Sequence, residues 1–185
     1  MVTNPRLQLS VEEFEQFCAQ PENAGRLFEY IGGEIVEVVS NNLSSTLAMR
    51  IAIKLGAYVL DHDLGELSGA DGGYRISGED YIPDVAFISK QRQPKPTLQS
   101  YNHIAPDLAV EALSPANTSD EIRIKVANYV NAGTVVWVVH PDKQRIEVYT
   151  AGQPVKLVGI TDTLDGGAVV PGFTLNVADI FKGIG

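Results

Sequence analysis

The sequence contains a single cysteine and only three histidines among its 185 residues. Because Cys18 has no second cysteine to pair with, an internal disulfide bond is excluded, and so is a metal cluster built on several thiolates. His62, His103 and His140 lie far apart in the chain and lack the short spacing typical of a histidine metal motif. A bound metal would therefore depend mainly on carboxylate oxygens.

Long apolar runs are also missing. No segment reaches the roughly 18 consecutive apolar residues that a membrane helix needs, and residues 1–10 lack the basic flank and apolar stretch of a signal peptide. We therefore expect a cytoplasmic protein with no membrane partner. The 44% hydrophobic content is enough for one core, and the length is that of one domain, so residues 1–185 are expected to form a single domain.

Positive charge is scarce, since 14 lysines and arginines face 23 aspartates and glutamates, giving a net charge of −9. Nucleic-acid-binding proteins usually present a basic face to the phosphates. The acidic balance weakens the case for a nucleic-acid partner without excluding one. A local basic groove can coexist with it, and a carboxylate site recruits divalent cations that change the local field.

Three helices are predicted from their capping residues and from apolar spacing. The first begins at Ser10, which forms a capping box with Glu13, and the third follows Thr118, which forms a second capping box with Glu121. Residues 42–60 form the middle helix, whose apolar stripe should pack on a sheet. The members of this stripe recur every four residues and are Leu43, Leu47, Ile51, Leu55 and Val59.

Short apolar segments separated by glycine and proline predict strands. Gly32-Gly33 tolerates the positive φ of a tight turn and should join residues 26–31 and 34–39 in a hairpin. Further strands are predicted at 66–68, 74–77, 84–88, 108–113, 134–140 and 145–150, with an exposed proline-rich loop at 91–100 and closing strands in 156–181. This order of elements predicts an α/β fold with a mixed central sheet flanked by helices.

Two carboxylates occupy positions where a globular domain normally places apolar side chains. Asp84 opens the strand that continues through residues 85–88, and alternation along the strand makes it face away from Phe87. Glu111 interrupts the apolar strand 108–113, which has the composition of a strand buried on both faces. A lone buried carboxylate is costly unless it is paired, hydrogen-bonded or bound to a cation. Two of them on neighbouring strands can share Mg²⁺ or Mn²⁺.

Lys125 is the third ionisable residue of this set. It lies on the border of the apolar stripe that Ile122, Val126 and Tyr129 form on the third helix, so its stem can pass over apolar surface and bring the ammonium to the sheet. In phosphodiester cleavage such a cation can position or help deprotonate the attacking water, while a metal stabilises charge on the phosphate. Taken alone, Lys125 is more typical of a surface lysine, and Asp84 of a strand cap.

An ordered set of short motifs resembles the signature of the Uma2 (DUF820) family. The set comprises Pro83-Asp84, Val110 to Pro115, then Glu121, Lys125, Tyr129 and Gly133 at four-residue steps, Trp137 to Pro141, Leu164 to Gly167, and Pro171 to Phe173. It extends over residues 10–181. The family is grouped with the PD-(D/E)XK nucleases, so the resemblance implies a restriction-endonuclease-like core with an extra N-terminal hairpin and C-terminal strands.

The resemblance also implies roles for individual residues. In the superfamily motif the lysine lies two residues after the acid, a position that Leu113 occupies here. The resemblance implies that the lysine has moved to the helix as Lys125, and that the carbonyl of Ala112 is an additional metal ligand. It further implies an acid early in the chain, and Glu34, which follows the glycine pair, matches that place better than Glu29 does.

Two positions depart from the family pattern. Many relatives carry an arginine two residues before Pro83-Asp84, where this chain has Tyr81, so a phosphate contact is lost. Relatives usually end the tryptophan-containing strand with aspartate, where this chain has His140. Neither difference changes the pair of acids expected to bind the metal.

We therefore expect a Mg²⁺- or Mn²⁺-dependent endonuclease that hydrolyses phosphodiester bonds in DNA, with Asp84, Glu111, Lys125 and Glu34 as its catalytic residues. The alternative is a non-catalytic, homodimeric binding or scaffold module that keeps the nuclease fold, which the acidic charge permits. A glycosidase with two carboxylates is a weaker third possibility, because it leaves Lys125 unexplained.

A symmetric homodimer is expected as well. The family resemblance implies it, and apolar hairpin residues such as Ile146 and Val148 are expected to exceed what one core can cover.

Overall fold

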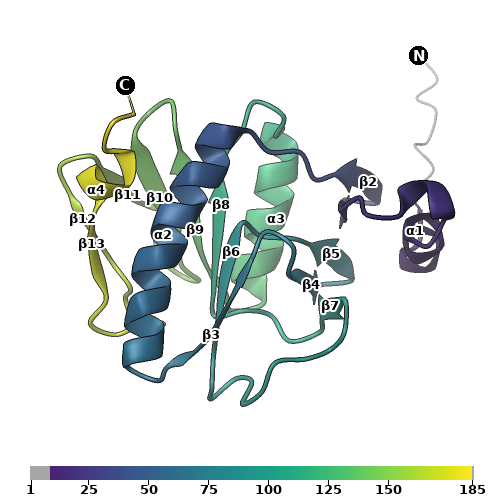
Figure 1. The fold of residues 1–185 in the computed structure, drawn as a ribbon, viewed down its shortest axis with the longest axis horizontal. Helices are drawn as coiled ribbons and strands as arrows, with labels where there is room; N and C mark the ends of the chain where they lie inside the picture. The colour runs from purple at the N-terminus through teal and green to yellow at the C-terminus, as the bar shows by residue number, and fades with distance from the viewer. Residues whose placement is uncertain (1–8, 185) are drawn as a thin grey trace.

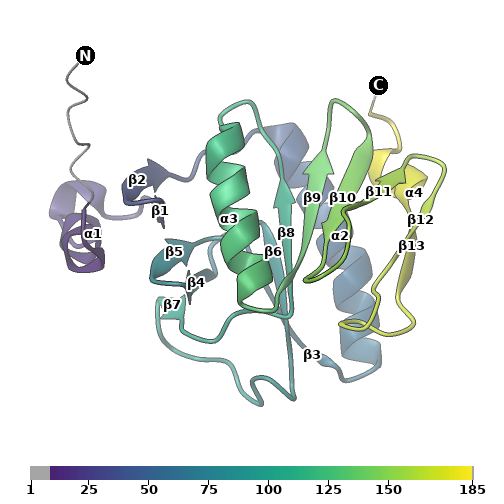
Figure 2. The same ribbon diagram turned by 180° about the vertical axis from the view of Figure 1, so that it is seen from behind.

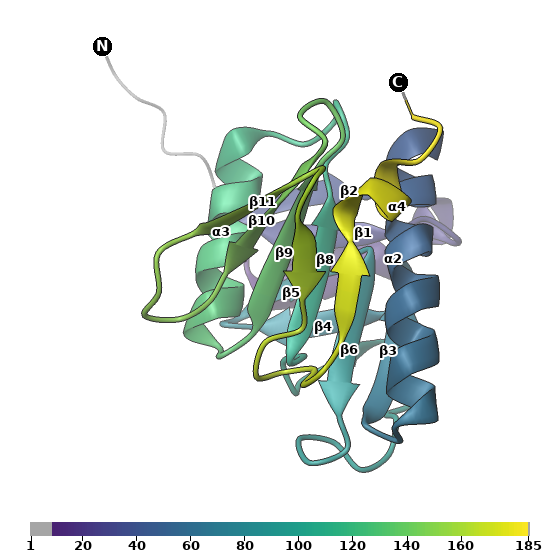
Figure 3. The same ribbon diagram turned by 90° about the vertical axis from the view of Figure 1, so that its left-hand side faces the viewer.

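The structure, a computed structural model, describes residues 9–184 and has three layers (Figure 1). A six-stranded sheet forms the middle layer, with α2 (Asn42–Asp61) on one face and α3 (Ser119–Asn131) on the other (Figure 3). In spatial order the strands are β11 (Lys156–Gly159), β10 (Arg145–Tyr149), β9 (Val135–His140), β8 (Leu108–Ala112), β6 (Val85–Ser89) and β3 (Gly65–Gly69). Neighbours are antiparallel except β8 and β9, which are parallel because the chain returns through α3 between them. The predicted α/β fold with a mixed central sheet is confirmed.

The long helix α2 packs lengthwise on one face of this sheet. Asn41 caps it by accepting a hydrogen bond from the Ser44 backbone N–H at 2.8 Å. Four members of the predicted stripe are fully buried, whereas Leu43 is exposed. A four-residue step advances about 400° around a helix, so a stripe of such steps rotates by about 40° per step and leaves the sheet at one end. The buried positions of the first turns are instead Ser44 and Ala48.

Among the helices of residues 9–184, α2 alone is long and apolar enough to cross a membrane by length and composition. Its buried stripe is that of a helix packed in a protein core, because Leu47, Ile51, Leu55 and Val59 contact the sheet within one apolar cluster. The opposite side of α2 carries the exposed apolar side chains Met49, Ile53 and Leu60.

The helix α3 covers the other face of the sheet. Its N-terminus has the predicted capping box, in which the Thr118 hydroxyl accepts from the Glu121 N–H at 3.2 Å and the Glu121 carboxylate accepts from the Thr118 N–H at 2.9 Å. Gly133, with a φ of +79°, follows its last turn and supplies the left-handed residue that ends the helix. Figure 2 shows α3 in front of β8 and β6. The capping box at the start of α1 (Val11–Cys18) is confirmed too.

A second, smaller sheet lies between α1 and the central sheet (Figure 2). Its strands, in spatial order, are β2 (Glu34–Glu37), β1 (Phe28–Ile31), β5 (Glu79–Tyr81), β4 (Gly73–Ile76) and β7 (Tyr101–Asn102). The predicted hairpin is β1–β2, and Gly32 and Gly33 both have positive φ in its turn. Phe14 of α1 is fully buried against the rings of Tyr30 and Tyr101. The short strands β5 and β7 were not predicted, because two or three residues carry no measurable alternation.

The C-terminal segment completes the core on the α2 side. It contains β12 (Thr163–Asp165), β13 (Thr174–Asn176) and α4 (Val177–Phe181), and the Phe173 ring stacks 6.1 Å from that of Trp137. Ile146 is fully buried in the same apolar cluster, and Val148 is partly buried against it. The expectation that these two hairpin residues exceed what one core can cover is therefore wrong, because the closing segment supplies the missing cover.

Candidate active site

Asp84 and Glu111 lie opposite one another on the α3 side of the central sheet. The antiparallel register of β6 and β8 pairs Val85 with Val110, and its continuation by one residue places Asp84 across from Glu111. Val85 and Val110 point into the apolar cluster under α2, so alternation turns both acids toward α3. The sequence-based expectation that the two carboxylates share one face of neighbouring strands agrees with this geometry.

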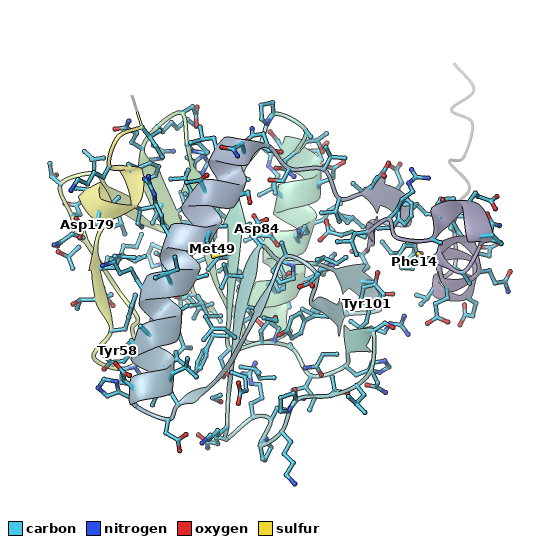
Figure 4. The ribbon with its side chains drawn as sticks, viewed as in Figure 1. Phe14, Met49, Tyr58, Asp84, Tyr101 and Asp179 are labelled. Carbon is cyan, nitrogen blue, oxygen red and sulfur yellow. The ribbon has the colours of Figure 1, made fainter. Side chains whose placement is uncertain are left out.

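The Asp84 carboxylate is fixed by the end of β8. Its Oδ2 accepts a hydrogen bond from the backbone N–H of Ala112 at 2.7 Å. Within a strand, the N–H and C=O of one residue point to the same side, so the Ala112 carbonyl is directed toward Asp84 as well. Burial raises the pKa of Asp84, while the Ala112 hydrogen bond and the charge of Lys125 oppose that rise. Oxygen-bearing groups of Asp84, Glu111 and Ala112 therefore line one cleft, where β6 begins and β8 ends. Figure 4 labels Asp84 at this place.

Lys125 reaches these acids from α3. Its Nζ lies 2.8 Å from Glu111 Oε1 and 2.8 Å from Glu29 Oε1, and all three side chains are almost completely buried. Burial by itself lowers the pKa of a lysine, but the two carboxylates outweigh that effect and raise the pKa of Lys125 above its usual value. Lys125 is therefore a permanently charged group at neutral pH.

The hairpin acid that contacts Lys125 is Glu29, whereas the sequence favoured Glu34 for this place. Glu29 lies in β1 and accepts hydrogen bonds from Lys125 at 2.8 Å and from the backbone N–H of Ile82 at 2.6 Å. Glu34 is exposed on β2, on the far side of the turn. A signal for Glu29 was present, because it interrupts the run Phe28-Glu29-Tyr30-Ile31 as Glu111 interrupts its own strand.

Three carboxylates lie near one ammonium in this site, and two of them, Glu29 and Glu111, are paired with it. Burial raises the pKa of Glu111, and the charges of Glu29 and Asp84 raise it further against the opposing effect of Lys125. The site thus carries an excess of negative charge when all three acids are ionised. An added cation would relieve that excess.

The acids border a cleft of about 50 Å³. It lies between the hairpin β1–β2, the end of β8 and the loop before α3, and it is also lined by Ser40, Ser114, Asn117 and Glu121. A single water molecule needs roughly 10–15 Å³ measured in this way, so the cleft has room for several.

The donor set fits Mg²⁺ better than a metal that requires a complete protein cage. Within residues 9–184, no three side chains of the His, Cys, Asp and Glu types form a group that could hold a metal ion alone. Mg²⁺ commonly keeps several waters and takes only one or two carboxylates from the protein. Asp84, Glu111 and the Ala112 carbonyl, beside a water-sized cleft, match that pattern.

The two departures noted in the sequence occupy different places. Tyr81 is fully buried, and its ring lies under Lys125, with the ammonium 5.8 Å from the ring centroid. His140 lies at the end of β9, with Nε2 3.2 Å from Glu147 Oε1 of β10. Tyr81 therefore belongs to the surroundings of the lysine, whereas His140 lies beside Glu147 on the neighbouring strand.

Comparison with known proteins assigns the chain to a family. A solved structure described as "a putative nuclease belonging to DUF820", from Anabaena variabilis, is similar to this chain with a TM-score of 0.81 and 19% sequence identity. The similarity covers 94% of this chain and 97% of that one, which shows a common fold. None of the curated proteins matches the sequence. The model of the family Uma2, described as "Putative restriction endonuclease", matches residues 11–178, so the chain belongs to the Uma2 family.

Proposed function

We propose that this protein is a Mg²⁺- or Mn²⁺-dependent endonuclease that hydrolyses phosphodiester bonds in DNA. The observation that carries the proposal is the opposition of Asp84 and Glu111 beside the buried, charged Lys125. The family description and the nuclease named in the similar structure support the same reaction class.

In this proposal Asp84, Glu111 and the carbonyl of Ala112 hold the metal. A bound Mg²⁺ supplies positive charge for the phosphate oxygens and lowers the pKa of a bound water. Asp84 is already oriented for this role by its hydrogen bond to Ala112, so little rearrangement is needed on the β6 side.

Lys125 acts as a fixed cation. Because its pKa is raised, it keeps its proton at neutral pH and does not serve as a general base. Its N–H groups can donate to the attacking water or to a phosphate oxygen that enters the cleft. Glu29 holds the lysine in place and, through Ile82, ties it to the segment that carries Asp84.

The alternative is a non-catalytic module that retains the fold. The observation in its favour is that Lys125 is fully engaged by two carboxylates, which is sufficient to explain all three buried charges as a structural unit. The two proposals differ in what happens when metal and DNA are supplied.

The test measures Mn²⁺ binding by calorimetry and cleavage of plasmid and single-stranded DNA at low salt. We expect wild type to bind Mn²⁺ and to cut, Glu111→Gln to lose at least tenfold in Mn²⁺ affinity, and Lys125→Ala to bind Mn²⁺ but not to cut. Glu34→Gln is the matched control, because its acid lies outside the site, and it should behave as wild type. Cleavage that persists in Glu111→Gln contradicts the site. Metal binding without any cleavage favours the scaffold.

We also propose a homodimer, formed through the outer side of α2. Met49, Ile53 and Leu60 are all more than half exposed and lie within about 40° of one another around the helix. Two copies with a charge of −9 repel each other, so contact is least unfavourable on a face whose centre carries no charge. Figure 4 shows Met49 on α2, away from the N-terminal hairpin that borders the cleft.

Light scattering tests the dimer. Wild type is expected at twice the 20.0 kDa chain mass at micromolar concentration, and Ile53→Glu at the mass of one chain. Lys54→Glu, a charge change beside this face, is the control and should remain dimeric. A wild type with the mass of a single chain contradicts the dimer.

A further inference from the structure

Three polar side chains outside the cleft connect two separate elements, β5 and α3. Tyr81 of β5 is fully buried, and its hydroxyl donates to the Glu79 carboxylate. Asn128 of α3 donates from Nδ2 to the Tyr81 hydroxyl at 2.6 Å and to Glu79 Oε2 at 3.2 Å. Glu79, Tyr81 and Asn128, called the clamp below, therefore join β5 to α3.

The clamp extends to the turn of the N-terminal hairpin. The other carboxylate oxygen of Glu79, Oε1, accepts a hydrogen bond from the backbone N–H of Gly32 at 2.8 Å. Gly32 has a φ of +59°, and a Cβ added there would lie 3.0 Å from Cδ1 of Ile124 on α3. The turn is thus held by Glu79 on one side and rests against α3 on the other.

The position of this turn determines where Glu29 lies. Glu29 belongs to β1, the strand that leads into the turn, and its Oε1 is held between the N–H of Ile82 and the ammonium of Lys125. Ile82 directly follows Tyr81, and Lys125 lies one helical turn before Asn128. Each partner of Glu29 is therefore attached to a member of the clamp.

We propose that Glu79, Tyr81 and Asn128 are positioning residues that hold the hairpin against α3 and so keep Glu29 on Lys125. This inference rests on the proposed nuclease function for its effect on cleavage, but not for its effect on structure. In the described part of the chain, the residues that line the cleft do not include any of the three, so they act through Glu29 and Lys125 and not on the substrate.

The test uses Tyr81→Phe, which keeps the ring under Lys125 and removes the hydroxyl. Asn128→Ala is the second variant, since alanine preserves the helix while removing both amide hydrogen bonds. The matched control is Tyr74→Phe. Tyr74 is a buried tyrosine paired with Tyr81 across β4 and β5, and its hydroxyl lies 2.9 Å from Ser68 Oγ, outside the clamp.

The structural readout is hydrogen exchange at the amides of Gly32 and Ile82, which donate to Glu79 and Glu29. Both clamp variants should speed exchange at these two amides at least tenfold relative to Tyr74→Phe, with no change at amides of β9. Unchanged exchange at both amides in Tyr81→Phe and Asn128→Ala overturns the clamp, whatever the protein does to DNA.

The kinetic readout separates positioning from general loss of stability. The clamp variants should lose about 10- to 100-fold in kcat with KM and Mn²⁺ affinity within threefold of wild type, while Tyr74→Phe keeps its kcat. Faster exchange at Gly32 and Ile82 with wild-type kcat overturns the role in positioning. If the wild-type protein cuts no DNA but the clamp variants still show faster exchange at Gly32 and Ile82, the clamp is supported. The proposed nuclease function is then contradicted.

Discussion

The two faces of the central sheet differ in whether they bury charge. On the α2 side, the side chains that β6, β8 and β9 direct toward the helix are apolar and buried. They pack against the apolar stripe of α2. On the α3 side the sheet also carries buried apolar side chains, but at one end this face presents Asp84 and Glu111, and Lys125 of α3 pairs with Glu111. Apolar burial stabilises the fold at about 25 cal/mol per Å², whereas burying charges costs free energy that pairing only partly returns. The apolar packing on both faces thus supplies the stability that offsets the burial of charges at one end of the α3 face.

Removing the buried cation should have the largest effect on this contrast. Lys125→Met keeps the length of the side chain but leaves Glu29 and Glu111 facing each other without a counter-charge, which should lower the free energy of unfolding by about 3–5 kcal/mol at pH 8. Urea denaturation measures this free energy of unfolding. The control is Lys54→Met, which changes an exposed lysine of α2. A decrease of less than about 1 kcal/mol in the free energy of unfolding would mean that water reaches Glu29, Glu111 and Lys125.

Truncation on the apolar face should cost almost as much but leave the chemistry intact. Leu55 of α2 is fully buried against the sheet, and Leu55→Ala should destabilise the protein by about 2–5 kcal/mol through lost burial and a residual cavity. Below its melting temperature, this variant should bind Mn²⁺ as wild type does. Weakened Mn²⁺ affinity in the folded variant would show that the two faces are not independent.

The third test follows the same comparison through the pH dependence of stability. In the metal-free protein the pKa of Glu111 is raised to about 8 from 4.5, so the folded state binds more protons than the unfolded state between these values. The stabilisation that comes from the proton on Glu111 in the folded state is complete below about pH 4.5 and is lost as pH rises through about 8. Glu111→Gln should remove this dependence and make the protein the more stable of the two at pH 8, as followed by thermal unfolding in EDTA. If wild type and Glu111→Gln lose stability equally as pH rises, the pH dependence comes from groups other than Glu111.

Much of this architecture follows from local sequence patterns. The capping boxes, the Gly32-Gly33 turn and the apolar stripe of α2 act over a few residues, so they predict the helices and the first hairpin. The polar interruptions at Asp84 and Glu111 also identified the acids, because an isolated carboxylate in an apolar strand demands a partner.

The rest depends on contacts between distant segments. Glu29 and Glu34 lie on either side of one turn, and only the docking of that turn on α3 decides which of them reaches Lys125. Ile146 is covered by residues from the C-terminal segment. The alternation of apolar and polar residues within its own hairpin does not predict this cover. Whether residues 1–185 form one folding unit remains a prediction.

The crossover β8–α3–β9 has a consequence for the order of assembly during synthesis. Glu111 and Lys125 belong to this one βαβ unit, so they can meet soon after both leave the ribosome, whereas Glu29 lies 96 residues before Lys125. The hairpin that carries Glu29 is made first, yet its carboxylate has no ammonium to contact until α3 emerges. We expect a nascent chain that ends before α3 to expose three unpaired acids along its strands, so the buried charges become tolerable only after about two thirds of the protein has been translated.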